Sequence, residues 1–142
     1  MTDFEREFDV AAPADRVWLV MRDVERWHEW TASVTNIRVV GGGPLRVGSR
    51  AWVRQPKFPP ALWEATEVDD AARTFTWVNR APGLRVIARH GVEARGAASR
   101  TRLSLRYERL LGPLLARPTR GITERYVDLE MNGLKARSEG RA

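Results

Sequence analysis

Two side chains capable of acid–base chemistry stand out in this 142-residue sequence, His90 and Tyr126. His90 lies in the run 84–93, where it alternates in step with the apolar Ala88 and Val92. Period-two alternation predicts a strand with these residues on its buried face. Because an apolar pocket disfavours the charged imidazole, His90 is a candidate general base or hydrogen-bond donor near neutral pH. Tyr126 is the second candidate catalytic residue, on the predicted buried stripe of a long helix.

The alternative for His90 is a structural role, with its ring bonded to a neighbouring strand or to the long helix. Most buried polar groups are satisfied in this way. Gln55 and Asn79 fall near predicted strand ends, where their amides can contact a ligand at a cavity mouth. Gln55 can equally shape the turn at Pro56.

Large aromatic residues form a second group, in which Trp77 shares parity with Phe75, and Trp63 shares parity with Ala65. Aromatic walls with a few polar groups suit flat, apolar ligands. The alternative for each ring is ordinary core packing. Trp18, Trp27 and Trp30 are expected to pack the short helices against the sheet. The candidate ligand-binding residues are therefore Gln55, Trp63, Phe75, Trp77, Asn79, His90 and Tyr126.

Other kinds of site find little support in the sequence. It has no cysteine, and His28 and His90, its two histidines, are 62 positions apart, so we predict no metal site. No G-x-S-x-G, G-x-G-x-x-G or P-loop motif is present, and we expect no cofactor.

The elements that must position these residues follow from periodicity. A strand over 4–10 precedes a helix over 13–22 and a second short helix over 23–27 capped by Asp23. Six strands are predicted over 34–40, 50–55, 61–68, 73–79, 84–93 and 100–108. A long helix over 113–137 follows, which Pro118 should kink. Its predicted buried stripe comprises Leu111, Leu115, Pro118, Ile122, Tyr126, Leu129, Gly133 and Ala136.

This order predicts a single α+β domain, in which a seven-stranded antiparallel sheet curls around the long C-terminal helix. Matching segments are AAPADRVW (11–18), DVERWHEW (23–30), VGS (47–49), WEATEV (63–68) and FTW (75–77), with Gln55-Pro56, Pro82-Gly83, His90, Gly112-Pro113 and Leu134-Lys135. In this order they resemble the START/Bet v 1-like (SRPBCC) superfamily, best in its bacterial polyketide cyclase/dehydrase-like branch. The resemblance implies a helix-grip fold with a hydrophobic cavity, in a family that includes aromatase/cyclases and lipid or sterol carriers.

The net charge of +6 comes from 24 basic residues, of which all but Lys57 and Lys135 are arginine. Most arginines fall on water-facing positions interspersed with acidic residues, and no nucleic-acid motif matches, so we expect no nucleic-acid partner. On the strand 50–55, Ala51 and Val53 are the more natural inward pair, with Arg54 as the alternative. An inward arginine there would be an anchor for a carboxylate or an enolate oxygen.

The longest stretch without a charged residue is 30–37, too short for a membrane span. The acidic N-terminus carries no apolar signal segment, so we expect a cytoplasmic protein. Monomer and homodimer both remain open. The leading hypothesis is binding of a small hydrophobic molecule, aromatic, polyketide- or lipid-like, between sheet and long helix. One alternative is an aromatase/cyclase or dehydratase acting on a polyketide intermediate. The other is a non-catalytic carrier or a regulatory module that binds a partner protein.

Overall fold

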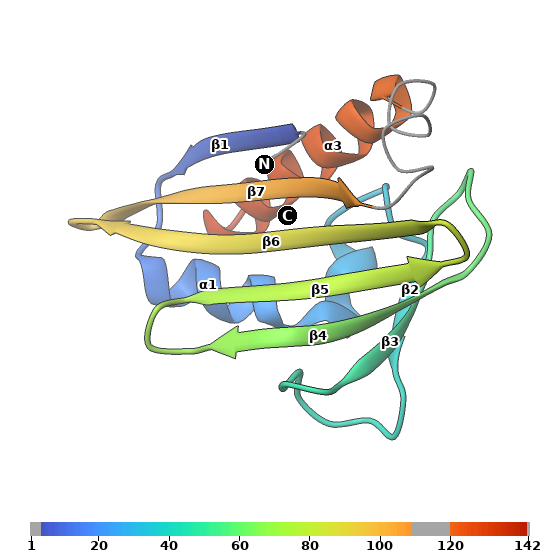
Figure 1. The fold of residues 1–142 in the computed structure, drawn as a ribbon. Coiled ribbons are helices and arrows are strands. Elements are labelled where there is room, and N and C mark those ends of the chain that lie inside the picture. The colour runs from blue at the N-terminus through green and yellow to red at the C-terminus, as the bar shows by residue number, and fades with distance from the viewer. Residues whose placement is uncertain (1–3, 109–119, 142) are drawn as a thin grey trace.

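Seven strands form one antiparallel sheet, and the helices lie together on one of its faces (Figure 1). The computed structural model describes residues 4–108 and 120–141. The elements are β1 (Phe4–Val10), α1 (Ala14–Arg22), the 3-10 helix η1 (Val24–Glu29), β2 (Asn36–Val39), β3 (Arg50–Arg54), β4 (Ala61–Asp69), β5 (Thr74–Ala81), β6 (Leu84–Arg95), β7 (Ala98–Glu108) and α3 (Arg120–Ser138). The strand order is β1-β7-β6-β5-β4-β3-β2, so the first strand closes one edge beside the last. The predicted α+β helix-grip architecture is confirmed.

Element boundaries differ from the prediction by a few residues. The second short helix is a 3-10 helix that continues to Glu29, and Asp23 precedes it without a side-chain capping bond. Pro13 is the N-cap of α1 rather than its first helical residue. The predicted start of the long helix and the kink at Pro118 lie outside the described residues.

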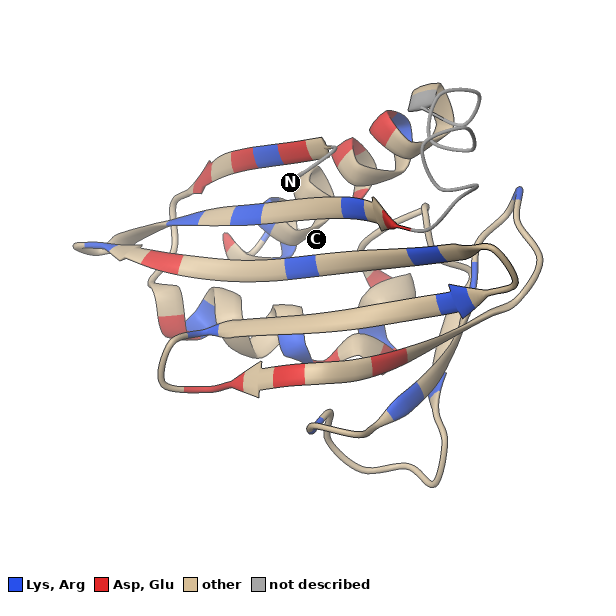
Figure 2. Cartoon of the chain, viewed as in Figure 1, with Lys and Arg blue, Asp and Glu red and all other residues tan. Residues whose placement is uncertain are grey.

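Alternation along the strands separates a buried inner face, which meets the helices, from a charged outer face. On β3, Ala51 and Val53 are buried and Arg54 is exposed, so the preferred facing of that strand is confirmed. On β6, Ala88, His90 and Val92 are buried, as their shared parity predicts. Figure 2 shows mostly acidic positions on β1 beside mostly basic positions on β7 and β6.

Tryptophans attach the short helices to the sheet, as expected. The Trp18 ring of α1 lies 6.2 Å from the Phe75 ring on β5, and the Trp18 Nε1–H donates to Asp70 Oδ1 at 2.9 Å. The Trp27 ring of η1 lies 5.6 Å from the Trp77 ring, and its Nε1–H donates to the Met21 carbonyl at 2.8 Å. Each indole buries its ring and satisfies its single donor.

The predicted buried stripe of the long helix is wrong for the described part of α3. Its most buried residues are Val127, Met131, Leu134 and Ser138. The described members of the predicted stripe, Ile122, Tyr126, Leu129, Gly133 and Ala136, are only half-buried and lie on a neighbouring flank. The reason is that α3 also packs against α1 and β1, which bury a second line of residues. Periodicity alone could not show which neighbours the helix would meet.

Candidate functional site

The His90 imidazole lies inside a cluster of aromatic rings at the centre of the inner face. It stacks on Phe75, with ring centroids 4.4 Å apart and planes 6° apart. The Trp27 ring lies 5.4 Å away and the Trp77 ring 6.2 Å away. Only 2% of the His90 side chain is exposed. The ring is therefore held rigidly in apolar surroundings.

One polar partner reaches this ring from α3. His90 Nε2 lies 3.0 Å from Glu130 Oε1, while His90 Nδ1 is buried without a partner among the described residues. We assign the neutral tautomer with its proton on Nε2, which donates to the Glu130 carboxylate. A charged imidazole would bury an unpaired N–H on Nδ1. The tautomer with its proton on Nδ1 would do the same and would also need a protonated Glu130, so both arrangements cost more free energy. This bond to the long helix is the one that the structural alternative for His90 anticipates.

Glu130 connects the aromatic cluster to a less enclosed part of the interior. Its side chain keeps 14% of its surface exposed, in contrast to His90. Along the inner face of β6, burial falls from complete at Ala88 to partial at Val86 and Leu84. The same change occurs on β5, from Phe75 and Trp77 to Asn79, and on β7, from Leu103 to Leu105 and Tyr107. We call this half-buried end of the inner face the open end.

The first half of α3 lies over the open end. Tyr107 Oη on β7 and Thr123 Oγ1 on α3 are 3.5 Å apart. The Tyr126 ring packs edge-on against Phe58, with centroids 5.7 Å apart, and its hydroxyl accepts from the Lys57 backbone N–H at 3.1 Å. Tyr126 therefore lies at the open end, one helical turn before Glu130, rather than in the ring cluster around His90.

Trp63, Asn79 and Gln55 are the predicted site residues that remain to be placed. Trp63 is half-buried, and its ring lies 5.6 Å from that of Trp77, so it continues the aromatic surface toward the open end. The Asn79 Nδ2–H donates to the Leu62 carbonyl at 2.9 Å, which ties β5 to β4. The Gln55 carbonyl accepts from the Phe58 N–H at 3.1 Å, as its turn alternative anticipates. Glu130 was missed, because nothing in the sequence links it to a histidine 40 residues earlier.

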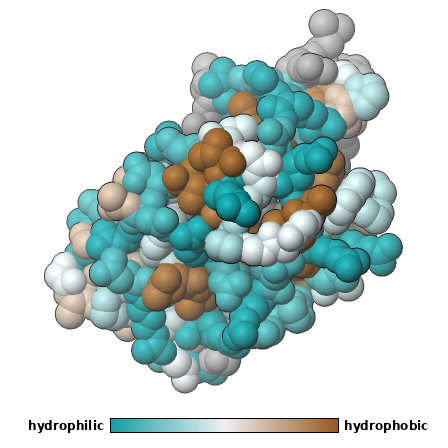
Figure 3. Space-filling model, turned by 90° about the horizontal axis from the view of Figure 1, so that it is seen from below, coloured by the Kyte–Doolittle hydropathy of each residue, from teal (hydrophilic) through white to brown (hydrophobic). Residues whose placement is uncertain are grey.

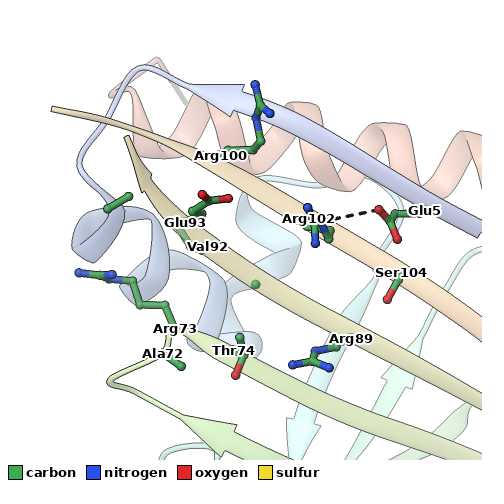
Figure 4. A pocket seen from close by; sticks show the side chains of 12 residues that line it. Glu5, Ala72, Arg73, Thr74, Arg89, Val92, Glu93, Arg100, Arg102 and Ser104 are labelled. Carbon is green, nitrogen blue, oxygen red and sulfur yellow. Dashed lines mark ion pairs between the residues drawn. The ribbon is translucent and has the colours of Figure 1, made fainter. Parts of the chain in front are cut away.

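A hollow of about 600 Å³ lies on the opposite, outer face of the sheet (Figure 4). Gly91, Arg89, Arg100, Arg102 and Glu93 are among the residues that line it. None of the predicted ligand-binding residues lines it. Arg100 and Arg102 are already engaged, at 2.8 Å from Asp9 and 2.6 Å from Glu7. The Arg100 guanidinium lowers the pKa of Asp9 through this hydrogen bond.

Two further findings concern the described residues alone. No three histidine, aspartate or glutamate side chains gather there in a geometry that could hold a metal ion. Among the helices in 4–108 and 120–141, none combines the length and apolar character needed to cross a membrane.

The fold and the interior site define a class of protein in which a curved sheet grips a long helix. Residues 1–139 match the family "Polyketide cyclase / dehydrase and lipid transport", and the chain belongs to that family. No curated protein sequence matches it significantly.

Solved structures share this fold at low sequence identity. The Zhui aromatase/cyclase from Streptomcyes sp. R1128 is 18% identical, with a TM-score of 0.75 over 97% of this chain and 93% of that one. Ara h 8.0201 is 15% identical, with a TM-score of 0.68 over 92% of this chain and 95% of that one. Norcoclaurine synthase from Thalictrum flavum is 16% identical, with a TM-score of 0.72 over 93% and 83% of the two chains. These likenesses establish the helix-grip fold.

Proposed function

We propose that residues 1–142 form one domain that binds a small hydrophobic molecule, aromatic, polyketide- or lipid-like, between the sheet and α3. The observation that carries the proposal is the fall in burial along the inner face, which leaves apolar and aromatic surface half-covered at the open end. Typical ligand sites are mostly apolar surfaces with a few polar groups, and the open end has this composition. Family membership supports it, because the family's description includes lipid transport.

The ligand in this proposal lies against Trp63, Val86 and Tyr126, with the sealed ring cluster as the inner wall. Trp77 and His90 belong to that wall, with Phe75 behind them, and the Glu130 carboxylate is the polar group at its boundary. Asn79 and Gln55 shape the rim through backbone contacts. The ligand is therefore expected to be flat and apolar, with one polar group that meets Glu130.

Two neighbouring residues of β6 give a matched test. Val86 faces the inner side, opposite Asn79 and Tyr107 in register, and Ile87 faces the outer side. Val86→Trp should fill the open end and weaken binding of the fluorescent probe 1-anilinonaphthalene-8-sulfonate by about tenfold or more, a loss of ~1.4 kcal/mol. Ile87→Trp adds the same ring on the other face and should leave probe binding unchanged. Equal effects of the two variants would contradict the proposal, and melting curves would show that both variants fold.

A second candidate function, an enzyme of the aromatase/cyclase or dehydratase kind, is favoured by the hydrogen bond between Glu130 and His90. Cyclisation and dehydration both need a proton removed from a carbon beside a carbonyl. Glu130 is the candidate to accept that proton, because its side chain is partly exposed and His90 contacts one of its two carboxylate oxygens. His90 then acts as a positioning residue that holds the carboxylate in one orientation.

Hydrogen–deuterium exchange of α-tetralone tests this second candidate. An active protein should accelerate exchange at the carbon next to the carbonyl, and Glu130→Gln should abolish the acceleration. Glu124→Gln, on the same helix, is the control and should retain it. If wild type and Glu130→Gln exchange the ketone at the same rate, the binding function stands without this chemistry.

A further inference from the structure

A segment of the chain that contains no acidic residue carries most of the protein's excess charge. Residues 30–63 include no Asp or Glu and five cations, against a net charge of +6 for the whole chain. The five are Arg38, Arg46, Arg50, Arg54 and Lys57. None of them forms an ion pair within 4–108 or 120–141. Arginines elsewhere on the outer face are neutralised, as Arg102 is by Glu7 at 2.6 Å.

These cations surround an exposed tryptophan on the β2–β3 hairpin. Arg50, Trp52 and Arg54 share the outer face of β3, and Arg38 on β2 pairs directly opposite Trp52. The Val40 N–H donates to the Arg50 carbonyl at 2.8 Å, so Val40 extends this face by one position. We call Arg38, Val40, Arg50, Trp52 and Arg54 the hairpin patch.

Apolar exposure is concentrated on the same hairpin. Trp52 is 46% exposed, Val40 50% and Val47 64%, and these are three of the four exposed large hydrophobic residues of the described chain. The loop between β2 and β3 projects beyond the sheet (Figure 1). In the view from below, Figure 3 shows hydrophobic patches bordered by hydrophilic side chains. The hairpin therefore presents apolar side chains and unpaired positive charge together at one edge of the molecule.

We propose that the hairpin patch, together with Val47, docks the protein on the surface of an anionic phospholipid membrane. Unpaired arginines attract the negative lipid headgroups, and their long aliphatic stems can lie along the boundary while the guanidinium groups stay in water. Tryptophan favours the headgroup level, where its ring is half in apolar surroundings. Valines on a projecting loop can enter that boundary without moving the sheet. Docking of this kind needs no membrane-spanning helix.

The mixture of side chains favours a lipid surface over other anionic partners. A single-stranded nucleic acid needs a series of aromatic platforms along a basic groove, whereas this patch has one tryptophan on an open strand face. An acidic protein would account for the arginines, but it would give the exposed Trp52, Val40 and Val47 side chains no apolar surface to enter. Exposed aliphatic side chains at a loop tip become buried when they enter a lipid boundary, and a charged polymer in water does not bury them. The proposal is independent of the ligand bound inside the domain.

Co-sedimentation with vesicles tests the proposal on the whole chain. Vesicles of phosphatidylcholine containing phosphatidylserine should bind the protein, and vesicles of phosphatidylcholine alone should not. The triple variant Arg38→Gln/Arg50→Gln/Arg54→Gln should weaken binding by about 100-fold, since each cation near the surface contributes about fivefold. Trp52→Ala should weaken binding without changing its dependence on salt.

The control variant removes the same charge from arginines that already have carboxylate partners. Arg95→Gln/Arg102→Gln/Arg106→Gln also lowers the net charge by three, and it should retain most of the binding because those cations are paired. Equal losses in the two triple variants would overturn the proposal, because net charge alone would then explain the attraction. Equal binding to vesicles with and without phosphatidylserine would also overturn the proposal. Tighter binding to a single-stranded oligonucleotide or to poly-glutamate that depends on the hairpin patch would also overturn the proposal. The partner would then be a nucleic acid or an acidic protein, respectively.

Discussion

Gly133 on α3 lies where no other residue has room, because the helix passes directly over the end of η1. A Cβ built on Gly133 would lie 1.9 Å from the Trp30 carbonyl oxygen and 2.9 Å from its carbonyl carbon. Carbon and oxygen atoms in close contact normally stay about 3.3 Å or more apart. Since the obstacle is backbone, relief needs a shift of η1 or of the whole helix. Gly133 belongs to the predicted buried stripe of the helix, and its close neighbour in the structure is Trp30.

Gly133→Ala should therefore destabilise the protein despite the better helix propensity of alanine. Propensity alone would add about 1 kcal/mol of stability, and overpacking costs about 1–3 kcal/mol or more. With a backbone obstacle the cost lies at the upper end, and the net loss should be about 2 kcal/mol. That corresponds to a fall in Tm of roughly 6 °C for a chain of this size.

Gly121 supplies the matched control, because a Cβ there would meet nothing within 4 Å. Gly121→Ala, near the start of the same helix, should be neutral or stabilising by up to about 1 kcal/mol. Urea unfolding followed by circular dichroism measures both variants under identical conditions. If Gly133→Ala were as stable as Gly121→Ala, the described approach of α3 to η1 would be wrong.

Further predictions concern the C-terminal end and the ring cluster. Hydrogen bonds from Lys135, from the Ala11 N–H and from Arg141 lower the pKa of Glu139 from 4.5 to about 2. Its stabilising effect is therefore complete above the unfolded pKa of 4.5 and is lost as the pH falls toward 2, so the Tm difference between wild type and Glu139→Gln should shrink over that range. Phe75→Ala should cost about 3–5 kcal/mol in urea unfolding, because the Phe75 side chain is fully buried. Nitrogen NMR shifts of His90 should report a neutral ring protonated on Nε2, and a proton on Nδ1 instead would contradict the assigned bond to Glu130.

The sheet was predictable because each strand carries its own pattern. Strict alternation on β6 placed His90 and Val92 on the buried face and Arg89 on the outer one, and the structure agrees. The order of the elements followed from the same patterns, and resemblance to a known family then indicated the helix-grip fold, which the solved structures share. Strand patterns are local, so a single sequence suffices to recognise them.

Contacts between distant segments were not predictable in the same way. Glu130 reaches His90 across 40 residues, and the buried line of α3 depends on α1 and β1, which the helix meets only after folding. Tyr126 was expected on the buried stripe of the long helix, and its contact with Phe58 at the open end could not be foreseen from that pattern. The charge of the hairpin patch was visible in the sequence as a gap in acidic residues, but whether its arginines find partners is a property of the fold.

Methyl-resolved NMR with a hydrophobic ligand tests the central claim most directly. Titration with α-tetralone reports on each valine, leucine and isoleucine separately, on both faces of the sheet. Binding at the open end predicts the largest shift changes at Leu84, Val86 and Leu105, with Val78 and Ile87 on the outer face unchanged. Shift changes confined to Val78 and Ile87, or absent from both faces at saturating ligand, would contradict a ligand site between the sheet and α3.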